Sequence, residues 1–216
     1  MTRILVFGDS NSWGTPPDGS GVRFDAATRW PQVMAKALGW ELAEENLPGR
    51  TTRHDDDWML GAAMNGLAHL PVALKSQSPV DWLVIMLGTN DLKARFEQDA
   101  AGIAAGLMML VDCARRIGGG QAGWEDDTPP KIAIVVPPAL GVLADDAKWP
   151  RLEEWAGGHA TSLALGDAVR HQAKMREVPV FDAGFVVKSS DIDPIHIDAE
   201  SHRALGLAVA EWLQTL

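Results

Sequence analysis

Three short polar segments of this chain carry the groups that cleavage of an acyl bond requires. A Gly-Asp-Ser segment at 8–10 follows an apolar run, a Gly-Thr-Asn-Asp segment at 88–91 follows another, and an Asp-Pro-Ile-His segment at 193–196 lies near the C-terminus. A serine hydroxyl attacks a carbonyl carbon when a base removes its proton and preorganised donors stabilise the oxyanion that forms. The segments supply a hydroxyl, an imidazole, a carboxylate and an amide, so together they predict nucleophilic serine chemistry.

Each of these groups has an expected role. Ser10 is the expected nucleophile, and His196 is expected to take its proton and return it to the leaving group. Asp193, three residues earlier on the same loop, can fix the tautomer of the imidazole. The expected oxyanion hole combines the backbone N–H groups of Ser10 and Gly49 with the side-chain amide of Asn90. Gly49 suits this role because a residue without a side chain lets a ligand approach the backbone.

Four neighbouring residues have less direct roles. Trp13 and Ile195 flank the expected catalytic groups in sequence, and both are candidates for the wall of the substrate pocket. Ser12 is a rival nucleophile, but we interpret it as a cap of the local turn. We expect Asp9 to hold its loop through hydrogen bonds to the backbone rather than to act as a base.

Two acidic stretches, at 54–57 and 191–198, resemble metal sites only in composition. Clustered carboxylates are more often part of a solvated loop surface, and the chain has no His or Cys set with the spacing of a known metal motif. We therefore expect neither a metal nor a cofactor. His202, at the start of the last expected helix, is predicted to be exposed.

Apolar strands that alternate with amphipathic helices must position these groups. Thr28 is the expected cap of the first helix, and Pro71 is expected to break the second. This alternation predicts a parallel sheet covered by helices on both faces. The expected strands span 3–7, 40–46, 82–87, 131–136 and 178–181, and the expected helices span 29–38, 62–74, 100–117, 160–176 and 201–213.

Length and charge restrict the class of protein. A chain of 216 residues fits one domain, 1–216. A net charge of -10, from 29 acidic and 19 basic residues, argues against nucleic acid or anionic lipid as a partner. No apolar run reaches ~18 residues, so no membrane span is expected. The sequence shows no secretory leader, which predicts a cytoplasmic location.

The polar segments also resemble, in order and spacing, the four blocks of the SGNH (GDSL-type) hydrolases. Those blocks correspond to 8–10, Gly49, 88–91 and 193–196, and they span nearly the whole chain. Segments 50–52, 85–93 and 181–184 are most similar to the bacterial arylesterase and acyltransferase (perhydrolase) group. Block two departs from the family pattern Gly-x-Asn, since Gly49 is followed by Arg50 and Thr51. Asn46 can replace the contacts of the family asparagine only in part.

This resemblance implies a flavodoxin-like three-layer α/β/α sandwich with a five-stranded parallel sheet. It also implies hydrolysis of short-chain esters without a metal, and some acyl transfer to alcohols or peroxide. Members of the group form octamers whose loops narrow the entrance to the site. The long connections 118–130 and 137–158, with Trp124, Trp149 and Trp155, are candidates for such contacts.

Two other classes of function stay open. One is a specialised deacylase with the same mechanism, either a deacetylase of an acetylated sugar or a thioesterase. The other is a flavodoxin-like binding module that has kept the fold without the chemistry. The second class is disfavoured because every group that the mechanism needs is present.

Overall fold

A five-stranded parallel sheet forms the centre of the computed structural model, which describes residues 1–120 and 128–216. The strand order is β2-β1-β3-β4-β5, and Ile4 lies opposite Leu42 on one side and Trp82 on the other. A strand buried on both faces has a continuous apolar sequence, which explains the runs in the central strands. The strands are β1 (Arg3–Gly8), β2 (Glu41–Asn46), β3 (Trp82–Met86), β4 (Lys131–Val136) and β5 (Val180–Asp182).

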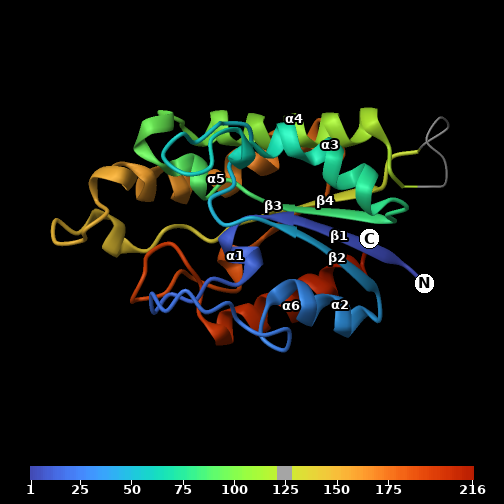
Figure 1. The fold of residues 1–216 in the computed structure, drawn as a ribbon, viewed down its shortest axis with the longest axis horizontal. Coiled ribbons are helices and arrows are strands. Elements are labelled where there is room, and N and C mark those ends of the chain that lie inside the picture. Colours follow the sequence, from blue (N-terminus) through green and yellow to red (C-terminus); the bar gives the residue numbers. More distant parts are fainter. Residues whose placement is uncertain (121–127) are drawn as a thin grey trace.

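Helices cover both faces of the sheet (Figure 1). Leu5 and Leu83 pack beneath α3, α4 and α5, whereas Ile4 and Val84 pack against α2 and α6. The expected three-layer α/β/α sandwich is therefore confirmed. The helices are α1 (Ser10–Trp13), α2 (Trp30–Leu38), α3 (Gly66–Gln77), α4 (Ala100–Ile117), α5 (Gly158–Lys174) and α6 (Ala199–Leu213), and the connections contain 3-10 turns at Ala62–Met64, Asn90–Leu92, Ala94–Phe96, Val142–Asp145, Glu153–Trp155 and Ala183–Phe185.

Two expectations about helix ends are wrong. The N-cap of α2 is Arg29 rather than Thr28, whose hydroxyl accepts a hydrogen bond from Arg203 instead. The expected helix over 62–74 is interrupted at Asn65, which caps α3, and Pro71 lies inside α3. The helix continues through the proline because Leu70 and Leu74 are fully buried against the core, and tertiary packing outweighs the helix-breaking preference of proline.

His202 is buried, which contradicts the expectation of an exposed side chain. It shares one face of α6 with Leu205 and Val209, at spacings that put all three toward α2 and the sheet. Its Nδ1 accepts a hydrogen bond from the Trp30 N–H at 3.4 Å, and its ring meets Phe24 edge-on. Removal from water lowers the pKa of His202 to about 3, so the imidazole is neutral at neutral pH.

Two of the three tryptophans in the long connections 118–130 and 137–158 pack inside this chain and are not free for contacts with other chains. Trp155 is fully buried and Trp149 is half-buried against the core, so both pack within this chain. Trp124, with residues 121–127, lies outside the described residues. Within the part of the chain that the structure describes, no helix is long and apolar enough to cross a membrane.

Candidate active site

The polar segments meet at the carboxyl end of the sheet, as expected for parallel strands. Ser10 begins α1 directly after β1, and Asp9 caps that short helix by accepting a hydrogen bond from the Asn11 N–H at 2.9 Å. The expectation that Asp9 holds the backbone is therefore confirmed. Burial raises the pKa of Asp9 to about 6, and the hydrogen bond from Asn11 offsets only part of this effect.

A continuous hydrogen-bonded chain joins Ser10, His196 and Asp193. The Ser10 Oγ lies 2.9 Å from His196 Nε2, and His196 Nδ1 lies 2.5 Å from Asp193 Oδ2. The other carboxylate oxygen of Asp193 accepts the Ile195 N–H at 2.8 Å. Burial acts to raise the pKa of Asp193, but the hydrogen bond and the charge of His196 outweigh it, so this pKa lies below its usual value. Asp193 is therefore an ionised partner for the imidazole.

Asn11 connects the Ser10 corner to the loop that carries His196. Its Nδ2 donates to the Ile195 carbonyl at 3.0 Å, and its Oδ1 accepts the Ile197 N–H at 3.2 Å. The amide thus holds the backbone on both sides of His196, from the opposite end of the chain. This role could not be predicted from the sequence, in which Asn11 is only a polar residue next to Ser10.

Gly49 and Asn90 lie beside Ser10 on the wall of one cavity of about 180 Å³. Gly49 has a φ of 92°, which favours glycine. The Asn90 Nδ2 donates to the Arg50 carbonyl at 3.2 Å and reaches Asp9 Oδ2 at 3.4 Å, so the amide is fixed beside the Ser10 hydroxyl. The described residues that line the cavity are Ser10, Thr15, Pro48, Gly49, Met59, Asn90, Lys93, Arg151, Trp155, Ile195 and His196.

Ile195 lines this cavity as expected, but Trp13 does not. The Trp13 ring lies under the Arg23 guanidinium at 5.0 Å, and its carbonyl accepts a hydrogen bond from Arg23 Nε. Trp155 is the aromatic residue of the cavity wall instead. It is 145 residues along the chain from Ser10, so no local pattern in the sequence pointed to it.

The interpretation of Ser12 as a turn cap is wrong, because Asp9 fills that position. Ser12 is fully buried, and its hydroxyl has no hydrogen-bond partner among the described residues. A methyl group on Gly8 would lie 2.6 Å from Ser12 Cβ, so the serine packs against the end of β1. Ser12 does not line the cavity, which removes it as a rival to Ser10.

Arg50, which follows Gly49 in block two, ties the first two strands together. Its Nη1 donates to the carbonyls of Gly8 and Glu45, and its guanidinium lies 4.1 Å from the centre of the Phe7 ring. Burial lowers the pKa of Arg50 to about 10. The amide of Asn46 is buried without a partner among the described residues and lines no part of the cavity, so its contacts do not replace those of the family asparagine.

A buried carboxylate also links block two to block three. Asp91 accepts the Thr52 N–H at 2.9 Å and the Thr52 hydroxyl at 2.5 Å. Burial raises the pKa of Asp91, although both Thr52 donors favour its ionised form. This link holds the turn with Gly49 beside the turn with Asn90.

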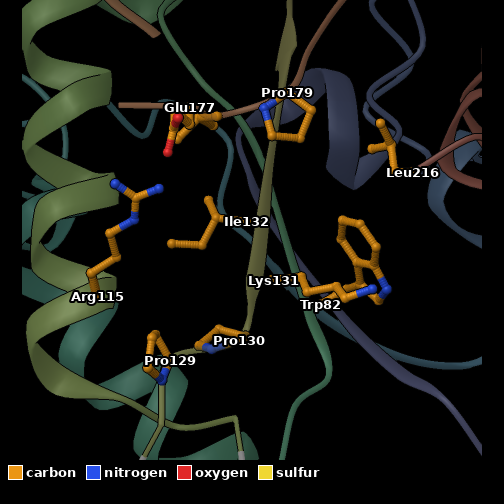
Figure 2. A pocket seen from close by; sticks show the side chains of 10 residues that line it. Trp82, Arg115, Pro129, Pro130, Lys131, Ile132, Glu177, Pro179 and Leu216 are labelled. Carbon is orange, nitrogen blue, oxygen red and sulfur yellow. The ribbon is translucent and has the colours of Figure 1, made fainter. Parts of the chain in front are cut away.

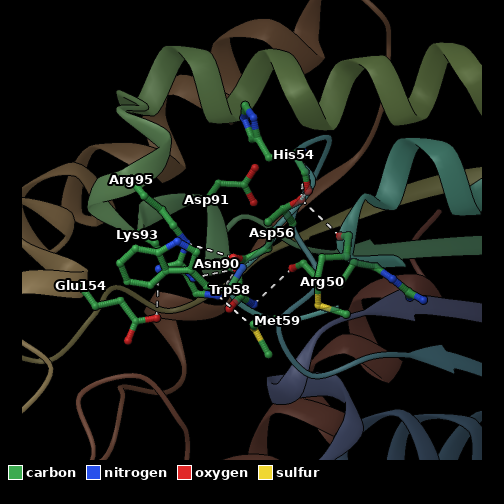
Figure 3. A network of polar contacts seen from close by, with 12 residues as sticks. Arg50, His54, Asp56, Trp58, Met59, Asn90, Asp91, Lys93, Arg95 and Glu154 are labelled. Atoms are coloured by element: carbon green, nitrogen blue, oxygen red, sulfur yellow. Dashed lines mark hydrogen bonds and ion pairs between the residues drawn. The ribbon is translucent and has the colours of Figure 1, made fainter. Parts of the chain in front are cut away.

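A network of charged side chains lies beside the cavity (Figure 3). Asp56 is buried and accepts Lys93 Nζ at 2.9 Å and Arg95 Nη2 at 2.7 Å. Arg95 also reaches Glu154 at 3.3 Å, and Glu154 accepts Arg151 Nε at 2.9 Å. The expectation that 54–57 is solvated loop surface is therefore wrong at Asp56, because two cations compensate its removal from water.

The network shifts the ionisation of its members. Burial acts to raise the pKa of Asp56, but the hydrogen bonds from Arg95 and Lys93 outweigh it, and its pKa lies below the usual value. Burial lowers the pKa of Lys93, and the ion pair with Asp56 opposes this shift. Across residues 1–120 and 128–216, no group of three or more His, Cys, Asp or Glu side chains is arranged to hold a metal ion.

A larger cavity, of about 560 Å³, lies at the opposite end of the sheet (Figure 2). Its wall includes Lys131 at the start of β4, Arg115 of α4, and Glu177. None of its described lining residues is a serine, cysteine or histidine, so it lacks the nucleophile and base that the smaller cavity brings together. Volume is therefore a poor guide to the active site in this molecule.

A serine whose hydroxyl contacts a histidine held by an aspartate, at the carboxyl end of a parallel sheet, defines the serine-hydrolase class of site. Residues 6–204 match the GDSL-like Lipase/Acylhydrolase family, and the chain belongs to that family. The resemblance to SGNH hydrolases is thereby confirmed. The protein is a carboxylic ester hydrolase of this type.

Solved structures of esterases are similar to this chain over full length. The aryl esterase of M. smegmatis is 36% identical, with 100% of each chain covered and a TM-score of 0.90. Est24, a carbohydrate acetylesterase from Sinorhizobium meliloti, is 33% identical, with 100% of this chain and 99% of that chain covered and a TM-score of 0.90. A search of curated proteins found no match.

Proposed function

We propose that Ser10, His196 and Asp193 form the catalytic triad of a short-chain esterase. The observation that carries this proposal is the hydrogen-bonded chain from Ser10 Oγ through the imidazole to Asp193. Ser10 Oγ attacks the ester carbonyl while His196 Nε2 takes its proton. His196 then protonates the leaving alkoxide, and an acyl-enzyme remains on Ser10. Water, deprotonated by the same imidazole, releases the acid.

The oxyanion of each tetrahedral intermediate is held by Ser10, Gly49 and Asn90. The backbone N–H groups of Ser10 and Gly49 have no backbone acceptor among the described residues, so both are available to a ligand. The Asn90 amide lies on the same wall: the Arg50 carbonyl orients it through one N–H, and the other N–H, which reaches Asp9 at the long distance of 3.4 Å, turns to the oxyanion. Donors fixed before the reaction begins stabilise developing charge without reorganisation, which is why this arrangement supports catalysis.

The cavity favours small acyl groups. Its volume of about 180 Å³ lies below the roughly 300 Å³ at which pockets for drug-sized ligands begin. The wall of Met59, Trp155 and Ile195 suits an apolar acyl or aryl group, in agreement with the similarity to an aryl esterase. An alcohol or peroxide that reaches the acyl-enzyme in place of water would give acyl transfer.

Deacetylation of a sugar is the second candidate, since Est24 is a carbohydrate acetylesterase of similar sequence and fold. The two functions share the triad and differ in the alcohol part of the ester. Comparison of kcat/KM for aryl acetates and acetylated sugars separates them.

Substitution of the triad tests the mechanism. Ser10→Ala and His196→Ala should each lower kcat for p-nitrophenyl acetate by roughly three orders of magnitude or more, because the nucleophile and its base act as a unit. Ser12→Ala is the matched control, since that hydroxyl is buried away from the cavity, and it should keep its activity. Circular dichroism confirms that each variant is folded. Retention of most activity in Ser10→Ala or His196→Ala would refute the triad.

We further propose that residues 1–216 form one hydrolase domain. We also propose that this domain assembles as a homo-oligomer, and the resemblance to the arylesterase and acyltransferase group favours an octamer. Trp58 and Leu60 support assembly, because they are 81% and 64% exposed and flank Met59 of the cavity wall. Light scattering tests this, and a mass near that of one chain would contradict it. A cytoplasmic location stays a prediction for cell fractionation.

A further inference from the structure

We propose that Lys93 and Arg151 form an anion-binding wall of the active-site cavity, so that the preferred esters carry a carboxylate remote from the scissile bond. The proposal rests on the proposed function, because it concerns the part of the substrate that lies beyond the triad. Of the described residues that line the cavity, these two are the ones with a charged side chain, and both are cations.

Lys93 has donor capacity left for a ligand. Its ammonium group carries three N–H donors, of which one binds Asp56 at 2.9 Å and one points to the Met59 sulfur at 3.4 Å, a weak acceptor. The side chain is only 2% exposed, yet it lines the cavity. A buried donor without a strong acceptor is costly. A ligand oxygen in the cavity would satisfy it.

The network of ion pairs around Lys93 holds more cations than carboxylates, and the Asp193 carboxylate of the site is already bonded to His196. Lys93, Asp56, Arg95, Glu154 and Arg151 alternate in sign along one line of ion pairs. Three cations against two carboxylates leave one net positive charge. The line begins and ends with a cation, and both terminal cations lie on the cavity wall, whereas Arg95 in the middle is shared between the two carboxylates.

Trp155 lies between the two terminal cations. Its ring centre is 6.0 Å from Lys93 Nζ and 5.4 Å from the Arg151 guanidinium. A short methylene chain can pack on this indole while its carboxylate meets the cations. Because Lys93 is buried, its attraction to an anion is screened less than that of a surface cation. Arg151 has a side chain that is 45% exposed and should contribute less.

Half-esters of dicarboxylic acids test this proposal. The monomethyl esters of malonic, succinic, glutaric and adipic acid each carry one carboxylate, and the corresponding dimethyl esters are neutral analogues of similar size. The measured quantity is the ratio of kcat/KM for the half-ester to kcat/KM for the dimethyl ester, from acid release at pH 7.5. We expect this ratio to exceed one by about tenfold at the chain length that spans the distance to Lys93, which corresponds to ~1.4 kcal/mol.

Three variants locate the source of the preference. Lys93→Met should lower the ratio about tenfold, and Arg151→Gln about threefold, at the preferred chain length. Asp56 keeps both hydrogen bonds from Arg95 in Lys93→Met, so its charge remains paired. Lys131→Met, a lysine at the opposite end of the sheet, is the matched control and should leave the ratio unchanged.

Two results would overturn the proposal: a ratio at or below one for every chain length, or a ratio that Lys93→Met and Arg151→Gln both leave at the value of the unmodified protein. Either result can occur while the dimethyl esters are hydrolysed, in which case the esterase function stands. A protein that hydrolyses neither series contradicts the proposed function itself.

Discussion

The Ser10 hydroxyl contacts His196 because the side chain of Asn11 holds the loop that carries His196 in place. Asn11 directly follows Ser10 in the chain. Its amide forms hydrogen bonds to the backbone of Ile195 and Ile197, on both sides of His196. One amide therefore fixes the relative position of nucleophile and base. A displacement of about 1 Å between reacting groups can cost ~100-fold in rate, so this contact bears directly on catalysis.

Asn11→Ala should lower kcat for p-nitrophenyl acetate by roughly 10- to 100-fold, with a smaller change in KM, because the amide orients the base and does not line the cavity. Steady-state kinetics measure this split. Asn65→Ala is the control. It removes an amide of the same kind that caps α3, and it should cost about 1 kcal/mol of stability while kcat stays unchanged. Equal kcat values for Asn11→Ala and the unmodified protein would exclude the positioning role.

Helix α4 packs closely on the turn at 49–52, which begins with Gly49 of block two. A methyl group on Gly106 would lie 2.9 Å from Thr52 Cβ, and Thr52 is the residue that Asp91 holds. The helix can therefore approach block two only through a residue without a side chain. The turns that carry Gly49 and Asn90 depend on this contact for their spacing.

Gly106→Ala should lower the free energy of unfolding by roughly 1–3 kcal/mol, because α4 must move away from Thr52 or Thr52 must change rotamer. Urea denaturation measures the change. Gly102→Ala lies in the same helix, where the added methyl meets the side-chain ends of Gln98 and of the N-cap Asp99 rather than a packed Cβ. It should change the stability by less than about 1 kcal/mol, since helix propensity there favours alanine. A similar loss in both variants would mean that contact with Thr52 is not the cause.

The sequence predicted well those elements whose evidence is local. The helix over 100–117 and the strand over 131–136 agree with the structure at both ends, because their apolar patterns are strong and glycine or proline flanks them. Pro71 was misjudged because burial of α3 against the core outweighs the helix-breaking preference of proline, whereas the start of that helix is set by the local cap at Asn65.

The same distinction applies to the site. Ser10, Asp193 and His196 lie in short motifs, and the structure brings them together as predicted. Lys93 and Trp155 could not be predicted, because they reach the cavity through contacts between segments that are distant in sequence. Only the folded sheet makes Asp56 a neighbour of Lys93 or places Trp155 across from Ser10.

Two features of the whole molecule concern its ionisable groups: the sign of the charges at the cavity and the burial of a neutral histidine. The chain has a net charge of -10, yet the charged side chains on the described cavity wall are both positive. A neutral imidazole, His202, is buried between α6 and α2 on the face of the sheet opposite α3, α4 and α5. Stability therefore depends on pH through a group that does not belong to the hydrogen-bonded chain of Ser10, His196 and Asp193.

The pKa of His202 is depressed in the folded protein, so its contribution to stability is complete above the unfolded value of about 6.5 and is lost as pH falls toward about 3. His202→Leu removes this dependence. The stability of the unmodified protein relative to His202→Leu should fall by ~1.4 kcal/mol per pH unit below pH 6. Asp9, whose raised pKa acts in the opposite direction, is common to both proteins and cancels. Parallel stability curves between pH 6.5 and 4.5 would contradict the buried neutral imidazole.

Covalent labelling distinguishes Ser10 from the other serines of the chain as the nucleophile. An organophosphorus fluoride reacts with a serine that a neighbouring histidine activates, and peptide mass spectrometry locates the adduct. We expect one adduct per chain, on Ser10, with loss of esterase activity in proportion to labelling and no adduct in His196→Ala. An adduct on another residue, or full activity in a protein fully labelled at Ser10, would contradict this expectation.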